Sequence, residues 1–233
     1  LYNLKRLTTI NENKPFPNVN LLYLKTYDFV ENSTDQYFAN VYALVLKSKA
    51  SFNISSDKFV NDLSKICSLS NLKCLTLIEN MYSTDFLVEL FKKTSQITSL
   101  RCSSEVLLTI MNDFPQLAHK IKDLFITLYE SNSSKIMKKL CSMLINIQYL
   151  SIKIANTNDL YILLPIILRI MVRQKLNSLT IILYFTEKFE SLTLMSWLND
   201  YICLNSVECE VDHVQNSGCL NMLFSDRHST FLI

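Results

Sequence analysis

A short leucine-containing phrase returns eight times along the chain and constrains its fold more than any other feature. The phrase has the form apolar-x-x-Leu-x-apolar, as in VNLLYL (19–24) and LKCLTL (72–77). Its copies follow one another at a mean period of about 26 residues, and a period of roughly 20–50 residues is typical of repeat architectures. The fourth residues of the eight copies are Leu22, Leu44, Leu75, Leu100, Leu124, Leu150, Leu179 and Val207.

The residues between the phrases carry the start signals and the apolar spacing of helices. Small polar residues at 55–57, 83–85, 103–104 and 132–134 precede apolar residues that recur at intervals of three and four. Such residues cap the exposed N–H groups at a helix start, and the spacing gives each helix one apolar face. Within each phrase the apolar residues alternate, which predicts a strand. One strand and one helix per period predict a horseshoe with its strands inside and its helices outside.

The stretch 69–100 carries a resemblance to a known family. It has Leu72, Leu75 and Leu77, then Asn80, then Thr84-Asp85 ahead of a helix. With this pattern at this period, residues 16–210 resemble the leucine-rich repeats of F-box proteins. The segments FPNVNLLYL (16–24) and FPQLAHKIKDLFI (114–126) are similar to the lead-in to a strand in that family, with Phe in place of Cys. Only one of the eight copies, at Asn80, matches the family at its Asn or Cys position.

The resemblance implies an α/β leucine-rich-repeat solenoid of about eight strand–helix repeats with a parallel concave sheet. It also implies an adaptor, in which an F-box docks onto a cullin-type ubiquitin ligase and the repeats hold the substrate. No F-box helices lie within the 233 residues, so if the parent protein has an F-box, we expect it ahead of Leu1. The alternative is a repeat scaffold or regulator with no link to ubiquitin.

We expect one elongated domain, with 1–15 as an N-terminal cap or cut edge, 16–210 as the solenoid and 211–233 as a C-terminal cap. Neither a Pro/Gly/Ser-rich linker nor a long block of charge interrupts the sequence. The segment 114–120 is expected to form a turn. The longest apolar run, 160–172, is too short for a membrane span of roughly 20 residues, so we expect a buried helix there.

Composition argues against several classes of function. Phosphate loops, dinucleotide fingerprints and nucleophile elbows need several glycines, whereas this chain has one, Gly218. A net charge of +2 argues against a dedicated nucleic-acid binder. Seven cysteines without a Cys-x-x-Cys pair, and no signal peptide, indicate reduced thiols in the cytoplasm or the nucleus. Cys203, Cys209 and His213 form a loosely spaced string for which a core role is favoured over zinc. We therefore expect a non-enzyme without metal or cofactor.

The outward-facing strand residues are the candidate binding site. Tyrosine, phenylalanine and arginine are favoured anchors in protein interfaces, and charges steer partners toward them. We predict that this row binds an acidic or phosphorylated protein segment, with Arg101 and Lys153 on the anion and Phe125 and Tyr23 in apolar contact. Ordinary solvated strand residues are the alternative, and neither a nucleic acid nor a membrane is expected as partner. The predicted contact residues are Tyr23, Lys25, Lys47, Arg101, Phe125, Lys153 and Glu208.

Overall fold

The chain forms an α/β fold that divides into two compact units, Leu1–Ile121 and Lys122–Ile233. We take each unit by itself. The computed structural model describes residues 19–25, 37–47, 56–78, 82–128, 137–139, 146–154, 162–163, 165–167, 178–183, 196, 209–214 and 219–224.

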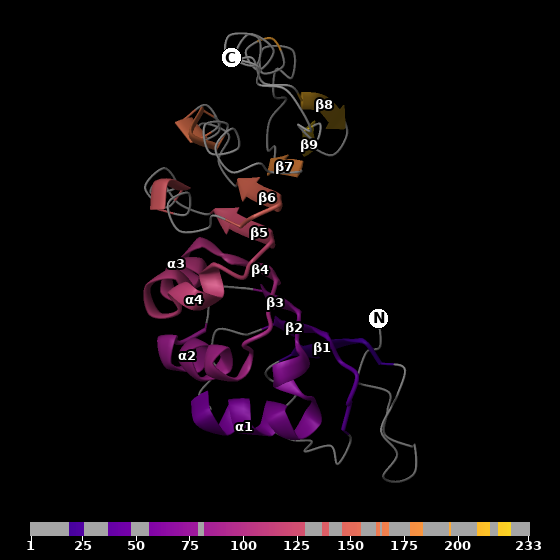
Figure 1. Cartoon of the computed structure of the whole chain (residues 1–233), viewed down its shortest axis with the longest axis vertical. Coiled ribbons are helices and arrows are strands. Elements are labelled where there is room, and N and C mark those ends of the chain that lie inside the picture. Colours follow the sequence, from indigo (N-terminus) through magenta and orange to yellow (C-terminus); the bar gives the residue numbers. More distant parts are fainter. Residues whose placement is uncertain are drawn as a thin grey trace, which may run out of the picture. The chain divides into compact units, whose positions relative to one another are not determined.

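The first unit alternates parallel strands with helices. Its strands pair in the order β1-β2-β3-β4, and the helices lie along one side of them (Figure 1). The elements are β1 (Leu21–Lys25), β2 (Ala43–Lys47), α1 (Ser56–Ile66), η3 (Leu69–Asn71), β3 (Cys74–Ile78), α2 (Thr84–Lys93), β4 (Ser99–Ser103), α3 (Ser104–Asp113) and α4 (Pro115–Ala118).

The leucine phrases align with one another in this sheet. Leu22 pairs with Leu44, Leu44 with Leu75, and Leu75 with Leu100, so the fourth residues of four phrases form one row. Each is at most 4% exposed. The predicted alternation of buried and outward residues is therefore confirmed in β1–β4, except at the end of β4.

The same backbone connection joins one repeat to the next. Two residues before the buried leucine, a carbonyl oxygen accepts hydrogen bonds from two consecutive N–H groups of the following repeat, at distances of 2.7–3.1 Å. This pattern needs no particular side chain. The accepting residues are Asn20, Tyr42 and Lys73 in the first unit and Lys122 in the second.

Serine side chains begin two of the predicted helices. The Ser83 hydroxyl accepts a hydrogen bond from the N–H of Phe86, and the Ser103 hydroxyl accepts one from the N–H of Val106. These are N-caps, which satisfy donors that the helix itself leaves without partners. The segment 114–120, predicted as a turn, contains the short helix α4 instead. Pro115 occupies its first turn, where the missing proline N–H costs no helical hydrogen bond.

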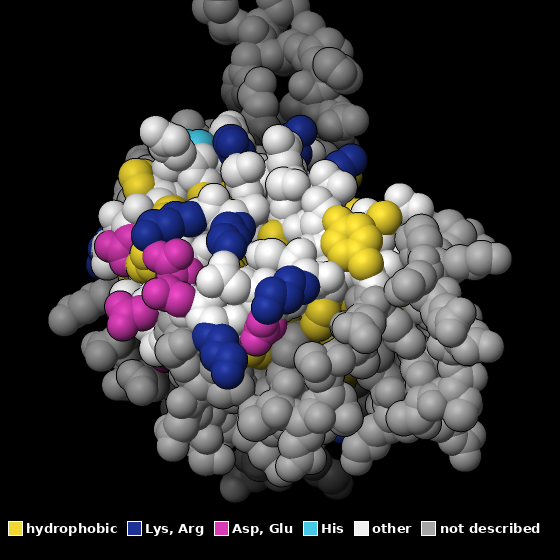
Figure 2. Space-filling model, turned by 90° about the horizontal axis from the view of Figure 1, so that it is seen from below, with side chains coloured by type: hydrophobic (Ala, Val, Ile, Leu, Met, Phe, Trp, Pro, Cys, Tyr) yellow, Lys and Arg dark blue, Asp and Glu magenta, His cyan; other side chains and the backbone are white. Residues whose placement is uncertain are grey.

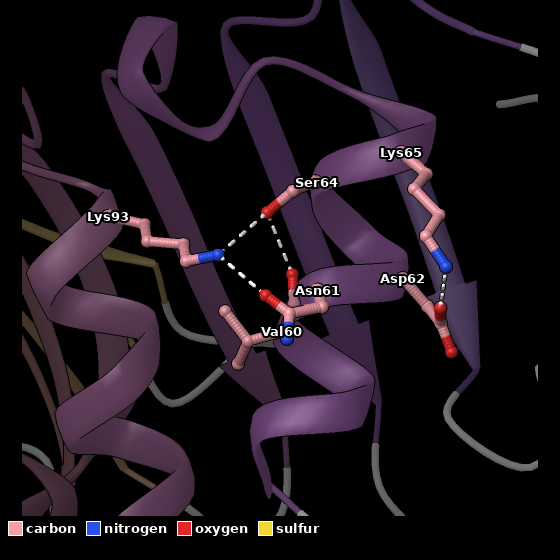
Figure 3. A network of polar contacts seen from close by, with 6 residues as sticks. All are labelled: Val60, Asn61, Asp62, Ser64, Lys65 and Lys93. Carbon is pink, nitrogen blue, oxygen red and sulfur yellow. Dashed lines mark hydrogen bonds and ion pairs between the residues drawn. The ribbon is translucent and has the colours of Figure 1, made fainter.

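Polar side chains tie neighbouring helices of the first unit together. The ammonium of Lys93, in the last turn of α2, donates to the Asn61 Oδ1 atom of α1 at 2.8 Å and lies 3.5 Å from the Ser64 Oγ atom (Figure 3). The same two helices also contact each other through the buried Phe59 and Phe86 rings, whose centroids lie 5.5 Å apart. α1 and α2 are therefore held together by an apolar contact and a polar contact at the surface.

The second unit repeats the pattern and then departs from it. β5 (Asp123–Leu128), β6 (Tyr149–Ile154) and β7 (Ser178–Leu183) are parallel, and Leu124, Leu150 and Leu179 are paired in register. Residues 137–139, 162–163 and 165–167, between these strands, are helical. Strand positions are thus confirmed for seven of the eight phrases.

The C-terminal end of the sheet departs from the parallel pattern. β8 begins at Cys209, the last residue of that phrase, and ends at Val214, while the residues just before Cys209 lie outside the described part of the chain. A ninth strand, β9 (Cys219–Phe224), pairs antiparallel with both β7 and β8. Only four residues separate β8 from β9, and parallel strands need a crossover of a dozen residues or more. The antiparallel pair therefore lies almost wholly within the segment predicted as a C-terminal cap, and the strand expected at the eighth phrase lies mostly outside the described residues.

Of the helices in the described residues, none has the length and apolar character that crossing a membrane requires.

Candidate protein-binding surface

The outward residues of β1–β4 form a surface that we call the first-unit outer face. They alternate with the buried leucines and lie on the side of the sheet turned away from the helices (Figure 1). Because the strands are parallel and in register, these residues form three rows that run across the strands. The face consists of Leu21, Tyr23, Lys25, Ala43, Val45, Lys47, Cys74, Thr76, Ile78, Ser99 and Arg101.

Four of the predicted contact residues belong to this face. Tyr23 and Arg101 lie in one row, at its two ends, with β2 and β3 between them. Lys25 and Lys47 are direct register partners in the next row, at the carboxyl ends of β1 and β2. Arg101 is exposed, whereas the other three side chains are half-buried. The first unit therefore brings two lysines side by side, which the spacing of the phrases alone did not emphasise.

Ser103, the next alternate residue after Arg101, does not belong to the outer face. This residue ends β4, is 4% exposed and caps α3, which begins at the next residue. With no loop between strand and helix, the Ser103 side chain turns to the helix N–H groups. The strand alternation alone would place Ser103 on the outer face, whereas the helix-start signal at residues 103–104 correctly predicts its role as a cap.

The second unit carries two more of the predicted residues. Phe125 on β5 pairs with Ser151 on β6, and Lys153 on β6 pairs with Thr127 on β5. Phe125 and Lys153 are both half-buried and occupy successive outward rows. Glu208 lies outside the described residues. Arg101 and Lys153, predicted to share one anion, belong to different units.

Two large apolar residues are exposed near the starts of β1 and β2. Leu21 is 44% exposed at the start of β1, and Tyr42 is 47% exposed just ahead of β2. Neither is among the predicted contact residues, which all come after the fourth residue of their phrases. The signal was present, since Leu21 directly precedes the buried Leu22 and must point to the opposite side.

The outer face differs in charge from the helical side of the same unit. Among its eleven positions three are basic and none is acidic. On the helices, charges of both signs lie beside one another, as in the Lys65–Asp62 and Lys92–Glu89 pairs, and Figure 2 shows such mixing at the end of the molecule where α1 lies. A mixed surface is typical of a solvated helix face, whereas a single sign favours an oppositely charged partner.

The buried cysteines are poorly suited to nucleophilic chemistry. Burial raises the pKa of the Cys67 thiol to about 12. Burial, and secondarily the nearby Glu105 carboxylate, also raises the pKa of Cys102. Both thiols therefore stay protonated near neutral pH, whereas the thiolate is the reactive and metal-binding form. In the described part of the chain, His, Cys, Asp and Glu form no group of three or more able to hold a metal ion.

The string Cys203, Cys209 and His213 is only partly placed. Cys209 and His213 lie four residues apart on β8, and Cys203 is outside the described residues. His213 is the register partner of Leu220 on β9.

Comparison with known proteins does not assign the chain to a family. No family model matches the chain, and no curated protein matches it. A solved structure of TYW1 with a lysine-pyruvate adduct bound is similar to it with a TM-score of 0.35 and 12% sequence identity. That similarity covers 75% of this chain and 62% of the TYW1 chain, so the chain spans less than two thirds of that protein.

Proposed function

We propose that this chain is a leucine-rich-repeat solenoid that recognises another protein through the outward residues of its strands. The observation that carries the proposal is the alternation along β1–β6, where buried leucines and isoleucines support outward rows of polar, basic and aromatic residues. Rigid strands that present such rows form a preorganised surface, which lowers the entropic cost of binding.

The repeated backbone connection supports the solenoid part of the proposal. In a solenoid each repeat contacts its neighbours in the same way, so the same hydrogen bonds should recur at each junction. The paired acceptance at Asn20, Tyr42, Lys73 and Lys122 has this property. The antiparallel pair of β8 and β9 would then serve as the C-terminal cap that a solenoid needs.

We further propose that these repeats hold the substrate of an F-box-like ubiquitin ligase adaptor in the cytoplasm or nucleus. This step rests on the resemblance of residues 16–210 to the repeats of F-box proteins and is therefore an analogy of fold. A scaffold or regulator without a ubiquitin link has the same surface and is the second candidate.

The experiment is affinity capture of the full-length gene product from cells, with partners identified by mass spectrometry. For a ligase adaptor we expect cullin-ligase subunits together with other proteins whose abundance rises when the proteasome is inhibited. Partners without any ligase subunit would refute the adaptor role and favour the scaffold. If capture returned no partner above an untagged control, recognition itself would be refuted.

A further inference from the structure

Apolar side chains adjoin one another at the amino ends of β1–β3, in a group that we call the apolar patch. Three of them are register partners in one row across β1, β2 and β3, and two pair in the next row. Leu21 is 44% exposed and Tyr42, directly ahead of β2, is 47% exposed, while the other four are half-buried. Single exposed apolar residues are ordinary, whereas adjoining ones favour contact with a partner. The apolar patch consists of Leu21, Tyr23, Tyr42, Ala43, Val45 and Cys74.

We propose that the apolar patch binds an amphipathic α-helix of a partner protein, which lies across β1–β3 with one helical turn over each strand. This inference rests on the proposed function and deepens it, because it names the kind of segment that is recognised and its direction on the sheet. It depends on apolar contact alone and uses none of the charged residues of the first-unit outer face.

The spacing of the strands favours a helix over an extended segment. Neighbouring strands lie about 4.8 Å apart and a helix rises about 5.4 Å per turn, so a helix across β1–β3 drifts from the strands by only about 1 Å. An extended segment in the same direction has same-side residues about 6.6 Å apart and drifts by about 4 Å. Along the strands the patch ends after two rows, because Lys25 and Lys47 occupy the next one. We therefore expect partner residues at positions i, i+3 or i+4, and i+7.

The size of the patch favours a short segment over a second copy of this chain. The patch spans about 10 Å across the strands and about 7 Å along them, which with the width of the side chains gives on the order of 200 Å². A stable interface between two proteins buries roughly 800 Å² on each partner, so this patch alone is too small for one. A helix of three turns is about 16 Å long, which matches the three strands and their side chains.

Tyr149 in the second unit provides a matched control. It is 48% exposed at the start of β6, one residue ahead of the buried Leu150, and so corresponds to Leu21 in its repeat. Its register partners are Asp123 and Ser178, both polar, so it is not part of an apolar patch. Binding that requires adjoining apolar residues should therefore depend on Leu21 and Tyr42 and not on this tyrosine.

The test is a phage selection against the immobilised full chain with two libraries of equal diversity. One library displays random linear dodecapeptides, and the other displays a small helical bundle in which one surface helix is randomised. The wild type is compared with Leu21→Ser/Tyr42→Ser, with Tyr42→Ser alone, which leaves the strands unchanged, and with Tyr149→Ser. Circular dichroism establishes that each variant is folded, and analytical ultracentrifugation measures its oligomeric state.

We expect binders from the helical library, with apolar residues at i, i+3 or i+4, and i+7. The double variant should bind them at least about tenfold more weakly, Tyr42→Ser by a smaller factor, and Tyr149→Ser as tightly as the wild type. Binders from the linear library alone, or helices that bind the double variant unchanged, would overturn the inference and leave protein recognition standing. So would a wild type that self-associates while the double variant is monomeric, or one that selects nothing although the full-length protein captures partners from cells.

Discussion

Leu75 provides a direct test of the alternation on which the fold and the candidate surface both depend. It is 1% exposed and lies between Leu44 and Leu100, which are equally buried. Replacing it with alanine removes three carbons from the core, and their transfer to water alone costs roughly 2.4 kcal/mol at about 0.8 kcal/mol per carbon. The backbone hydrogen bonds on both sides of β3 hold the strands apart, so the hole cannot close, and we expect a total loss of about 3–4 kcal/mol.

Thr76, the next residue on the same strand, is the matched control. It points to the outer face, where it is half-buried between Val45 and Arg101. Thr76→Ala removes a hydroxyl and a methyl group from a surface position, so we expect a loss of less than about 1 kcal/mol, set by β-propensity and contacts across the strands.

Urea unfolding followed by far-ultraviolet circular dichroism measures both variants. At a slope of roughly 2 kcal/mol per molar urea, the Leu75→Ala midpoint should fall by about 1.5–2 M, and that of Thr76→Ala by less than about 0.5 M. Hydrogen exchange of the β3 amides would assign the loss to the first unit. If the two substitutions cost the same free energy within error, the alternation and the outer face built on it are both wrong.

Three further predictions concern side chains with defined contacts. Ser83→Ala should destabilise the protein by about 1 kcal/mol because the N–H of Phe86 loses its cap, and Ser83→Asp should retain the stability in the same urea assay; equal losses for both would argue against capping. Lys93→Met should cost less than about 1 kcal/mol, since its bond to Asn61 lies at the surface, and a larger loss by calorimetry would mean that the contact is worth more than we infer. Burial raises the pKa of Cys67 from its ordinary value of 9.0 to about 12. The thiol therefore contributes its full stability below pH 9.0, and this contribution is lost as the pH rises toward about 12, by roughly 1 kcal/mol per pH unit. Unfolding measured between these pH values should therefore depend less on pH in Cys67→Ala, and an unchanged slope would contradict burial of the thiol.

The sequence predicted the elements that depend on local patterns. Seven phrases contain strands, and the helices after residues 55, 83 and 103 begin where small polar residues come before an apolar face. Such signals are local, because a strand needs only alternation and a helix start needs only a cap. The four-residue helix α4 was missed because it is too short to show a helical period.

The departure at β8 and β9 depends on contacts between distant residues. Leu220, Met222 and Phe224 alternate directly after the single glycine, Gly218, which is a strand and turn signal that the leucine phrase did not include. Even with this signal, the local sequence does not indicate that β9 pairs with β7 and thus lies between β7 and β8. The pairing of Lys25 with Lys47 could be predicted from the sequence, since both residues come three positions after the buried leucine of their phrases.

The backbone arrangement of each repeat requires few particular side chains, which explains why the family pattern is weak in the sequence. Only one phrase has the Asn of the family pattern, at Asn80, yet each described junction within a unit is made by a backbone carbonyl that accepts two backbone N–H groups. The acceptors Asn20, Tyr42 and Lys73 have different side chains (an amide, a phenol and an amine), and the bond uses only the main-chain carbonyl that they share. If these bonds and a few apolar positions suffice to align the strands, the other residues of each repeat are free to change. The absence of a matching family model is then compatible with a repeat fold whose outward residues are free to diverge.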